Sequence, residues 1–213
     1  MSPDAVTADR VYRALKRQIM LGELRPGASL VLNQIAENAG TSVSPVRDAI
    51  LRMVGERLLE MSGGGGFAVP AVTCERITQY YGWHADLLRV ALRSINDPAD
   101  IGEFPGDVCR ADSADSHHLA DLADELFGRI GSCSTNPEHL YAIISMSTRL
   151  HLVRVHEIVL PRALPELESL WNIVRSGNKR STRTALWHYH RRRLFNVEEI
   201  FAAMMTNGFI DRG

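Results

Sequence analysis

The sequence predicts a mainly α-helical protein, in which a small amino-terminal domain of three helices and a β-hairpin precedes an all-α helical bundle. Near the amino terminus, two amphipathic helical patterns are joined by a tight turn that contains glycine, and two short apolar runs then flank four consecutive glycines. From Cys74 onward the sequence shows helical stripes without strand-like alternation. We therefore expect two domains, at residues 1–72 and 73–213.

The composition is that of an ordinary globular protein, with 213 residues, 45% hydrophobic and 23% charged. Cys74, Cys109 and Cys133 are widely spaced and form no CxxC pair, so neither a disulfide framework nor a thiolate zinc site is encoded. The first ten residues contain two acids and lack the apolar core of a signal peptide, and nowhere do 18 uncharged apolar residues run together. We expect a cytoplasmic protein that does not span a membrane.

The first helix is predicted over residues 7–21. Val11, Leu15 and Ile19 fall at i, i+4 and i+8 with basic residues between them, which gives an amphipathic pattern. Gly22 and the turn at residues 25–27 end it.

Two further helices form a helix-turn-helix pattern. The second covers residues 32–39 and stops at Gly40, which is suited to a left-handed cap. The third begins near residue 43, because Ser42 is a good N-cap and Pro45 is tolerated in a first turn. Its expected buried stripe consists of Val46, Ala49, Ile50 and Met53 and continues to Leu58 at its end.

A β-hairpin is predicted next. The apolar runs at residues 58–61 and 67–70 flank Ser62 and the glycines 63–66. The glycines form either a flexible hairpin tip or a wing whose backbone can approach DNA closely, because no Cβ intervenes. A phosphate-binding P-loop fits poorly, since no Gly-Lys-Ser/Thr follows.

These residues resemble the amino-terminal winged helix-turn-helix of the GntR family of bacterial transcription regulators. The resemblance covers nearly all of residues 9–70. It rests on Val11, Leu21 to Gly27, Ile35-Ala36, Gly40 to Ser42, Pro45 to Ile50 and the glycine-rich hairpin. It implies a homodimer whose two recognition helices read a short palindromic operator in double-stranded DNA.

Helix geometry suggests how the third helix would meet DNA. Its amino-terminal end offers free N–H groups to phosphate, Ser42 and Ser44 suit phosphate or base edges, and Arg47 suits guanine or phosphate. The alternative for Arg47 is an intramolecular ion pair. Similar proteins often carry Arg at Val43 and sometimes at Asn33, so the operator sequence is not predicted, and Val43 suits a thymine methyl instead. The candidate DNA contacts are Asn33, Ser42, Val43, Ser44, Arg47, Arg52, Gly64 and Gly65.

The second domain is predicted to be helical throughout. Candidate helices cover residues 75–96, 113–133, 136–160, 163–176 and 179–205, separated by Asn, Pro and Gly signals that include Asn96-Asp97-Pro98. This part resembles the FCD effector domain of the FadR subgroup, through residues 121–127 and 173–178. That resemblance implies a bundle that binds a small ligand, often with a divalent metal.

The metal pattern of that domain is largely absent. Asp124 stands at the Asp position, but Gly128, Leu167 and Tyr189 stand at the three His positions. A lone carboxylate does not hold a transition metal, so we expect no metal and no other cofactor.

Three alternatives remain for the bundle. The first is a metal site rebuilt from Asp124, His84, His151 and one of His188 and His190, which diverge on a helix. The second is a metal-free pocket for a small, acidic metabolite, and the third is a filled core that serves only dimerisation. The candidate effector contacts are His84, Asp124, His151, Arg154 (with Arg149 as an alternative) and Tyr189.

We expect a ligand-responsive regulator and not an enzyme. The sequence contains no HExxH, no GxSxG and no Cys-His context. The competing interpretations are a metal-dependent hydrolase built on the bundle and an architectural protein that binds DNA without sequence preference.

Charge is segregated along the chain, although the formal net charge is only -1. Residues 10–25 hold five Lys or Arg against Glu23, residues 97–125 hold nine acids against Arg110, and residues 178–193 hold six bases and no acid. Near-neutrality therefore does not exclude a nucleic-acid partner. The acidic and basic blocks either neutralise each other or form two solvated faces.

Overall fold

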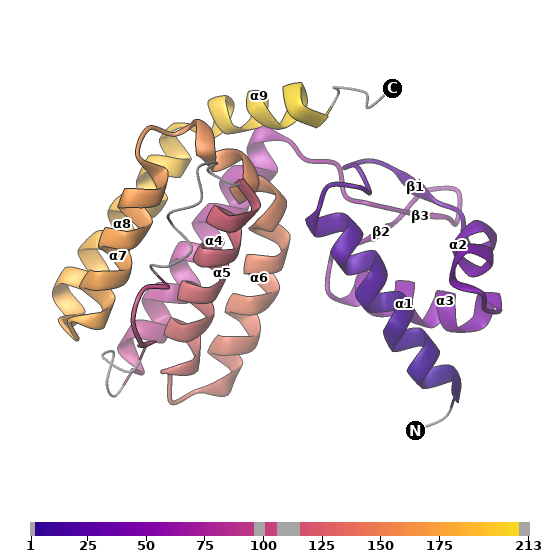
Figure 1. Ribbon diagram of the computed structural model, residues 1–213, viewed down its shortest axis with the longest axis horizontal. Coiled ribbons are helices and arrows are strands. Elements are labelled where there is room, and N and C mark those ends of the chain that lie inside the picture. Colours follow the sequence, from indigo (N-terminus) through magenta and orange to yellow (C-terminus); the bar gives the residue numbers. More distant parts are fainter. Residues whose placement is uncertain (1–2, 96–100, 106–115, 209–213) are drawn as a thin grey trace. The chain divides into compact units, whose positions relative to one another are not determined.

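The computed structural model of the chain describes residues 3–95, 101–105 and 116–208 (Figure 1). It divides into two compact units, Met1–Val72 and Thr73–Gly213. Among the described residues, no helix combines the length and apolar character needed to cross a membrane.

The described part of the amino-terminal unit combines three helices with a small sheet. The elements are α1 (Pro3–Met20), β1 (Ser29–Leu30), α2 (Leu32–Ala39), α3 (Val43–Gly55), β2 (Glu60–Met61) and β3 (Phe67–Ala68). The bounds of α2 agree with the prediction, whereas α1 begins at Pro3 and not at residue 7.

The core of this unit lies between α1 and α3, with α2 and the sheet beside them. The predicted stripe of α3 is confirmed, because Val46, Ala49, Ile50 and Met53 are all buried. They join Val11, Leu15, Ile19 and Phe67 in one hydrophobic cluster. The orientation of α3 is therefore fixed by its apolar face, which leaves the opposite face in solvent.

The sheet has three strands in the order β1-β3-β2, all antiparallel. Leu30 and Met61 pair with Phe67 from opposite sides. The hairpin was predicted, but β1 was not, because a strand of two residues shows no periodicity. Gly27 donates a backbone hydrogen bond to Val69 at 2.9 Å with φ +82°, and so the turn at residues 25–27 brings β1 to β3.

The prediction that α3 continues to Leu58 was wrong. The helix ends at Gly55, and Arg57 adopts a left-handed backbone conformation with φ 58°. The N–H of Leu58 bonds the carbonyl of Met53 at 2.9 Å, and that of Arg57 bonds Val54 at 3.0 Å. This pattern closes the helix so that Leu58 and Leu59 turn into the core.

The carboxy-terminal unit is helical throughout its described residues. Its elements are α4 (Cys74–Arg93), α5 (Ser116–Ser132), α6 (Pro137–Val155), the 3-10 helix η3 (His156–Val159), α7 (Ala163–Arg175), α8 (Lys179–Phe195) and α9 (Val197–Gly208). Figure 1 shows α4 to α8 aligned side by side as a bundle. Its interior contains large buried side chains such as Trp171, Phe127 and Tyr81.

Two predicted helices of this unit are in fact divided. The helix predicted at 136–160 changes to the tighter η3 at His156. The helix predicted at 179–205 breaks at Asn196, whose side-chain amide donates to the carbonyl of Arg192 at 2.7 Å and so terminates α8. The predicted break at residues 96–98, the start of the helix predicted at 113 and Cys109 lie outside the described residues.

The left-handed conformation of Arg57 predicts a stabilising substitution. Arg57→Gly should raise the free energy of unfolding by about 1 kcal/mol, because glycine adopts this conformation without the steric cost of a Cβ. Urea unfolding monitored by circular dichroism measures the change.

Gly40→Ala is the matched control. Gly40 has φ 61° and a Cβ there would meet no atom within 4 Å, so only backbone strain is added. It should lower the free energy of unfolding by a similar amount. If Arg57→Gly also destabilised the protein, the conformational account of this turn would be wrong.

Candidate functional site

The start of α3 presents a polar surface to solvent. Gly40, with φ 61°, forms a tight turn in which Thr41 donates to the carbonyl of Ala36 at 3.0 Å. Ser42 occupies the N-cap position with extended backbone, as predicted, but its side chain makes no capping hydrogen bond. Ser42 and Ser44 are exposed, so their hydroxyl groups and the first-turn N–H groups face solvent.

Arg47 lies on the same exposed face of α3. Within residues 3–95, 101–105 and 116–208, its guanidinium makes no hydrogen bond or ion pair, so the described structure does not show the alternative of an internal ion pair. Val43 is half-buried and packs against the hydrophobic core, which leaves only part of its side chain accessible. Asn33 is exposed on α2.

Arg52 differs from Arg47, although both were predicted to contact DNA. Its Nη1 lies 3.3 Å from Asp9, its Nε lies 3.2 Å from Glu56, and its guanidinium stacks 3.7 Å from the ring centroid of Tyr12. Tyr12 in turn donates to Glu56 at 2.6 Å. Arg52 thus joins α3 to α1 through its side chain, and its contact with DNA stays a prediction.

The hairpin tip is compact and accessible. Ser62 and Gly66 close it through a backbone hydrogen bond of 2.9 Å, and Gly65 has φ +80°. Gly64 and Gly65 are exposed, and a Cβ at either would meet no atom within 4 Å. The tip therefore leaves its backbone open to a partner.

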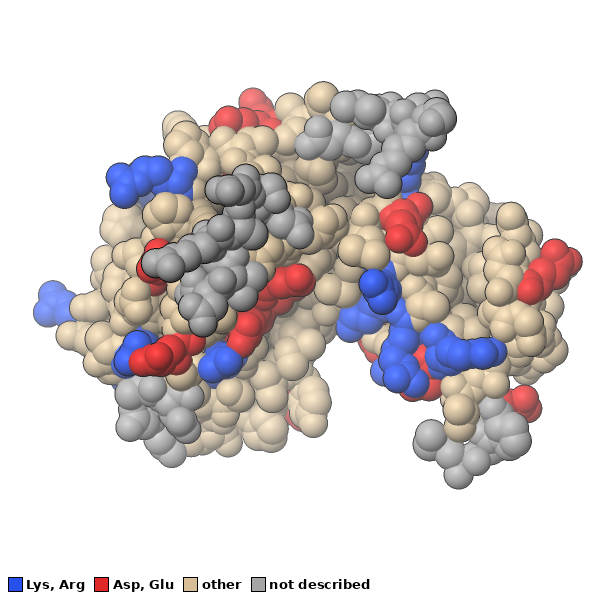
Figure 2. Space-filling view, viewed as in Figure 1, with Lys and Arg blue, Asp and Glu red and all other residues tan. Residues whose placement is uncertain are grey.

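The basic residues of α1 divide into two groups. Arg10 donates to the carbonyl of Ala39 at 3.1 Å, and Arg13 pairs with Asp9 at 2.8 Å. The side chains of Lys16 and Arg17 make no hydrogen bond or ion pair in the described part of the chain. Figure 2 shows blue side chains gathered on the amino-terminal unit, at the right of the view.

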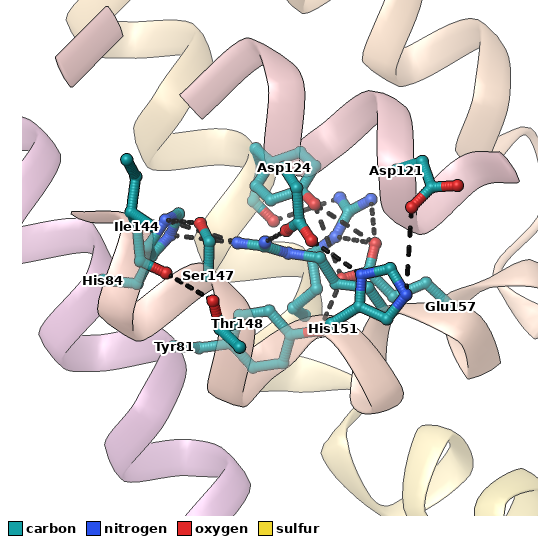
Figure 3. A network of polar contacts seen from close by, with 12 residues as sticks. Tyr81, His84, Asp121, Asp124, Ile144, Ser147, Thr148, His151 and Glu157 are labelled. Atoms are coloured by element: carbon teal, nitrogen blue, oxygen red, sulfur yellow. Dashed lines mark hydrogen bonds and ion pairs between the residues drawn. The ribbon is translucent and has the colours of Figure 1, made fainter. Parts of the chain in front are cut away.

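A second polar cluster lies inside the helical unit (Figure 3). We call it the buried network; its members are Tyr81, His84, Asp124, Ser147, His151, Arg154, Glu157, Tyr189, His190 and Arg193. It includes all five candidate effector contacts, so the structure brings these together. Sequence reasoning missed Glu157 and Arg193, because a charged residue on a helix is usually solvated and no local pattern marks its burial.

Glu157 is the acceptor at one end of the buried network. It is 1% exposed and accepts from Tyr81 at 2.5 Å, from Arg193 Nε at 2.9 Å and from Tyr189 at 3.3 Å. Burial by itself would raise the pKa of Glu157, but Arg193, Arg154 and Tyr81 outweigh it and lower that pKa. Glu157 is therefore a carboxylate in the protein interior.

Arg154 is the main cation at the other end of the buried network. It is fully buried, its Nη1 pairs with Asp124, and its Nη2 lies 3.3 Å from His84 Nε2. Asp124 also bonds His151 Nδ1 at 2.7 Å, and Asp121 lies 4.0 Å from His151 Nε2.

The hydrogen bonds fix the tautomers of two buried histidines. His190 Nδ1 lies 2.7 Å from the carbonyl of Leu186, which only accepts, so this nitrogen carries the proton. His190 Nε2 must then accept from His84 Nδ1 at 2.9 Å. His84 Nε2 is left to accept from Ser147 or Arg154 at 3.4 and 3.3 Å. With both rings neutral, each ring nitrogen has a partner.

Burial explains why both rings are neutral. It lowers the pKa of His190 to about 4, with Arg154 and Arg193 contributing in the same direction and the Leu186 carbonyl opposing them. Burial, Arg154 and His190 hold the pKa of His84 well below its ordinary value. His188, by contrast, is exposed on α8, which agrees with the prediction that His188 and His190 diverge.

The residues at the positions of the expected metal pattern do not fit a metal ion. Asp124 is engaged by Arg154 and His151, Tyr189 by Glu157, and Leu167 is buried in the apolar core. Among the described residues, no three His, Cys, Asp or Glu side chains are grouped as metal ligands. The rebuilt site from His84, His151 and Asp124 is therefore not formed.

The basic block of α8 also has partners that the sequence did not suggest. Arg192 and Arg193 pair with Glu166 of α7 at 2.8 and 2.6 Å, while most acids of residues 97–125 lie outside the described part of the chain. Together, the carboxylates Asp124, Glu157 and Glu166 balance the guanidinium groups Arg154, Arg192 and Arg193. Among these described groups the charges cancel, so none of the three guanidinium groups is left over for an acidic ligand.

The neutral histidines predict a stability that depends on pH. The free energy of unfolding should fall by roughly 2–3 kcal/mol as the pH is lowered from about 7 to about 4. The unfolded chain, with histidine pKa values near 6.5, binds more protons in this range than the folded chain, whose His190 has a pKa of about 4. Below that pKa the contribution of His190 to the slope ends. Urea unfolding at several pH values measures it.

Two variants isolate the contribution of His190. His190→Gln should reduce the pH slope, whereas His188→Gln, an exposed neighbour on α8, should retain it. All three proteins retain the groups that surround His190, namely His84, Arg154, Arg193 and Glu157. Identical slopes in all three would refute the burial of a neutral His190.

Comparison with known proteins gives a family match over the amino-terminal unit and matches to two transcriptional regulators. Residues 7–69 match the family described as bacterial regulatory proteins, gntR family. The HTH-type transcriptional regulator McbR of Escherichia coli K12 is 35% identical over 98 residues, which are 45% of this chain and 44% of that protein. The uncharacterized HTH-type transcriptional regulator YdhC of Bacillus subtilis 168 is 29% identical over 93 residues, 44% of this chain and 42% of that protein. These matches span less than half of either relative.

Solved structures share the fold over most of the chain. A GntR protein from Rhodococcus sp. RHA1 has a TM-score of 0.69 at 22% identity, covering 92% of this chain and 98% of that one. E. coli McbR/YncC has a TM-score of 0.58 at 20% identity, covering 94% and 100%. With the tight turn, α3 and the three-stranded sheet, these findings identify the amino-terminal unit as a winged helix-turn-helix domain of the GntR family, followed by a helical carboxy-terminal domain.

Proposed function

We propose that the chain is a transcription regulator that binds double-stranded DNA as a homodimer and whose DNA affinity responds to a small acidic metabolite bound by the helical domain. The observation that carries DNA binding is the exposed guanidinium of Arg47 on α3, which has no partner among the residues that the structure describes. It lies on the helix of a GntR-family winged domain that follows the tight turn.

The exposed end of α3 has the chemistry needed in a major groove. Its amino-terminal N–H groups and the hydroxyls of Ser42 and Ser44 suit phosphate oxygens, while Arg47 suits the O6 and N7 of guanine. The accessible part of Val43 suits a thymine methyl, and Asn33 on α2 suits a phosphate or a base edge.

Other surfaces of the domain would add contacts that do not depend on sequence. Lys16 and Arg17 supply positive charge on α1, and the backbone at Gly64 and Gly65 can approach the sugar-phosphate chain. Such contacts position the protein, whereas Arg47 and its neighbours on α3 would specify the bases.

The homodimer follows from the family resemblance and from the need for two recognition helices. A symmetric dimer would read a palindrome with half-sites about one helical turn apart, roughly 34 Å. A metabolite would act by shifting the relative placement of the two winged domains. The shift can be only as large as the difference in the metabolite's affinity for the two placements.

Removal of the Arg47 side chain is the test of DNA binding. Arg47→Ala should weaken binding to a DNA fragment from upstream of the protein's own gene by about tenfold to hundredfold, as expected for one lost guanine contact. Fluorescence anisotropy over a series of KCl concentrations measures both the affinity and its salt dependence.

The control is Arg180→Ala, which removes an exposed arginine from α8 in the helical domain. It should leave the affinity unchanged. An excess of unrelated DNA should compete poorly with the specific fragment, which distinguishes a regulator from an architectural protein. The proposal fails if no fragment binds at low salt, or if both variants bind as the parent does.

A further inference from the structure

We infer that a cleft between α4 and α8 is a binding site for a small aromatic carboxylate, an inference that rests on the regulator function proposed above and names the class of its effector. Among the described residues, His190 is the one member of the buried network that lines the cleft, and the charged members of that network are balanced by one another. The lining of the cleft contains none of the five effector contacts expected from the sequence.

The cleft has the size and lining of a small-molecule site. Its volume is about 400 Å³, within the range typical of ligand pockets. Its walls are mainly apolar, and its lining includes Ala85, Trp187 and His190 together with the charged residues Asp86, Arg89 and Arg183.

The charges at the cleft favour an anion. Asp86 pairs with Arg89 at 2.8 Å, which neutralises both. Arg183 makes no hydrogen bond or ion pair among the residues that the structure describes, so one positive charge at the rim lacks a partner. A carboxylate over an apolar wall would meet a guanidinium at the edge and form a charge-assisted hydrogen bond.

Trp187 favours a ligand whose carboxylate is attached to an aromatic ring. Its side chain is 52% exposed, although most large aromatic side chains are well covered. The indole ring lies at 75° to the ring of His188 with centroids 4.8 Å apart, and Arg191 lies 4.8 Å from it. A second flat ring in the cleft would cover the indole and remove apolar surface from water.

His190 connects the cleft to the interior. His190 is one of the lining residues although it is only 2% exposed, and its Nε2 accepts from His84, which lies against Arg154. A ligand in the cleft would therefore press on α8 beside the buried network without separating Arg154 from Asp124. This arrangement avoids the high cost of breaking a buried ion pair.

Isothermal titration calorimetry of the full chain with 2-naphthoate and with its neutral analogue 2-naphthamide tests the site. 2-Naphthoate should bind at least tenfold more tightly, because only the acid pairs with Arg183. Arg183→Gln should weaken 2-naphthoate about tenfold and leave 2-naphthamide unchanged. Arg180→Gln, on the same helix but outside the lining, is the matched control and should bind both compounds as the parent does.

A variant that fills the cleft tests whether binding depends on the space in the cleft as well as on the charge of Arg183. Ala85→Phe should weaken both compounds, and its melting curve without ligand shows whether the fold is retained. If Ala85→Phe fails to fold, Arg183→Gln with Arg180→Gln still decides the question.

The inference is overturned if the acid and the amide bind equally, if neither binds at millimolar concentration, or if Arg183→Gln has no effect. It is also overturned if 2-naphthoate does not bind and Trp187→Arg converts a dimer into a monomer, since the cleft would then be a subunit interface. Calorimetry requires no DNA, so loss of DNA binding alone would overturn the regulator function and leave the site standing.

Discussion

One buried carboxylate, that of Glu157, holds three segments of the helical domain together. It lies on η3 and accepts hydrogen bonds from Tyr81 of α4 and from Tyr189 and Arg193 of α8. An uncompensated charge at this depth would cost several kcal/mol, so α4 and α8 must both be in place for η3 to be stable. Arg154 and Asp124 repeat the arrangement between α6 and α5, and burial, with a smaller contribution from the neighbouring cations, keeps His84 and His190 neutral.

The two domains place their charged side chains differently, and this difference relates to their proposed roles. The winged domain has an apolar core, and Arg47, the proposed DNA contact, lies exposed at its surface without a partner among the described residues. In the bundle, the buried arginines Arg154 and Arg193 pair with carboxylates, so these described charges balance one another. A ligand that brings its own negative charge is therefore better accommodated beside Arg183, at the edge of the bundle, than among the buried groups.

Much of the winged domain was predictable because its signals are local. Gly40 ends α2 where a left-handed residue is needed, and the spacing of Val46, Ile50 and Met53 fixes the buried face of α3. The strand β1 was missed because its two residues are positioned only by pairing with β3. Likewise, Asp124, His84 and His151 could be named as a cluster, but the roles of Arg193 and Glu157 depend on contacts between distant segments. The break at Asn196 was missed because an asparagine side chain ends α8 where neither Gly nor Pro gives a signal.

The most direct measurement for the central claim is hydrogen–deuterium exchange of the full chain with and without a DNA fragment that it binds. If DNA is bound by the start of α3 and the glycine-rich hairpin, exchange should slow in peptides that cover residues 41–48 and 62–67. Peptides from α4 and α8 should be unaffected by DNA, because the account places no DNA contact there. Protection confined to the helical domain, or absent from residues 41–48 while DNA is bound, would contradict the account.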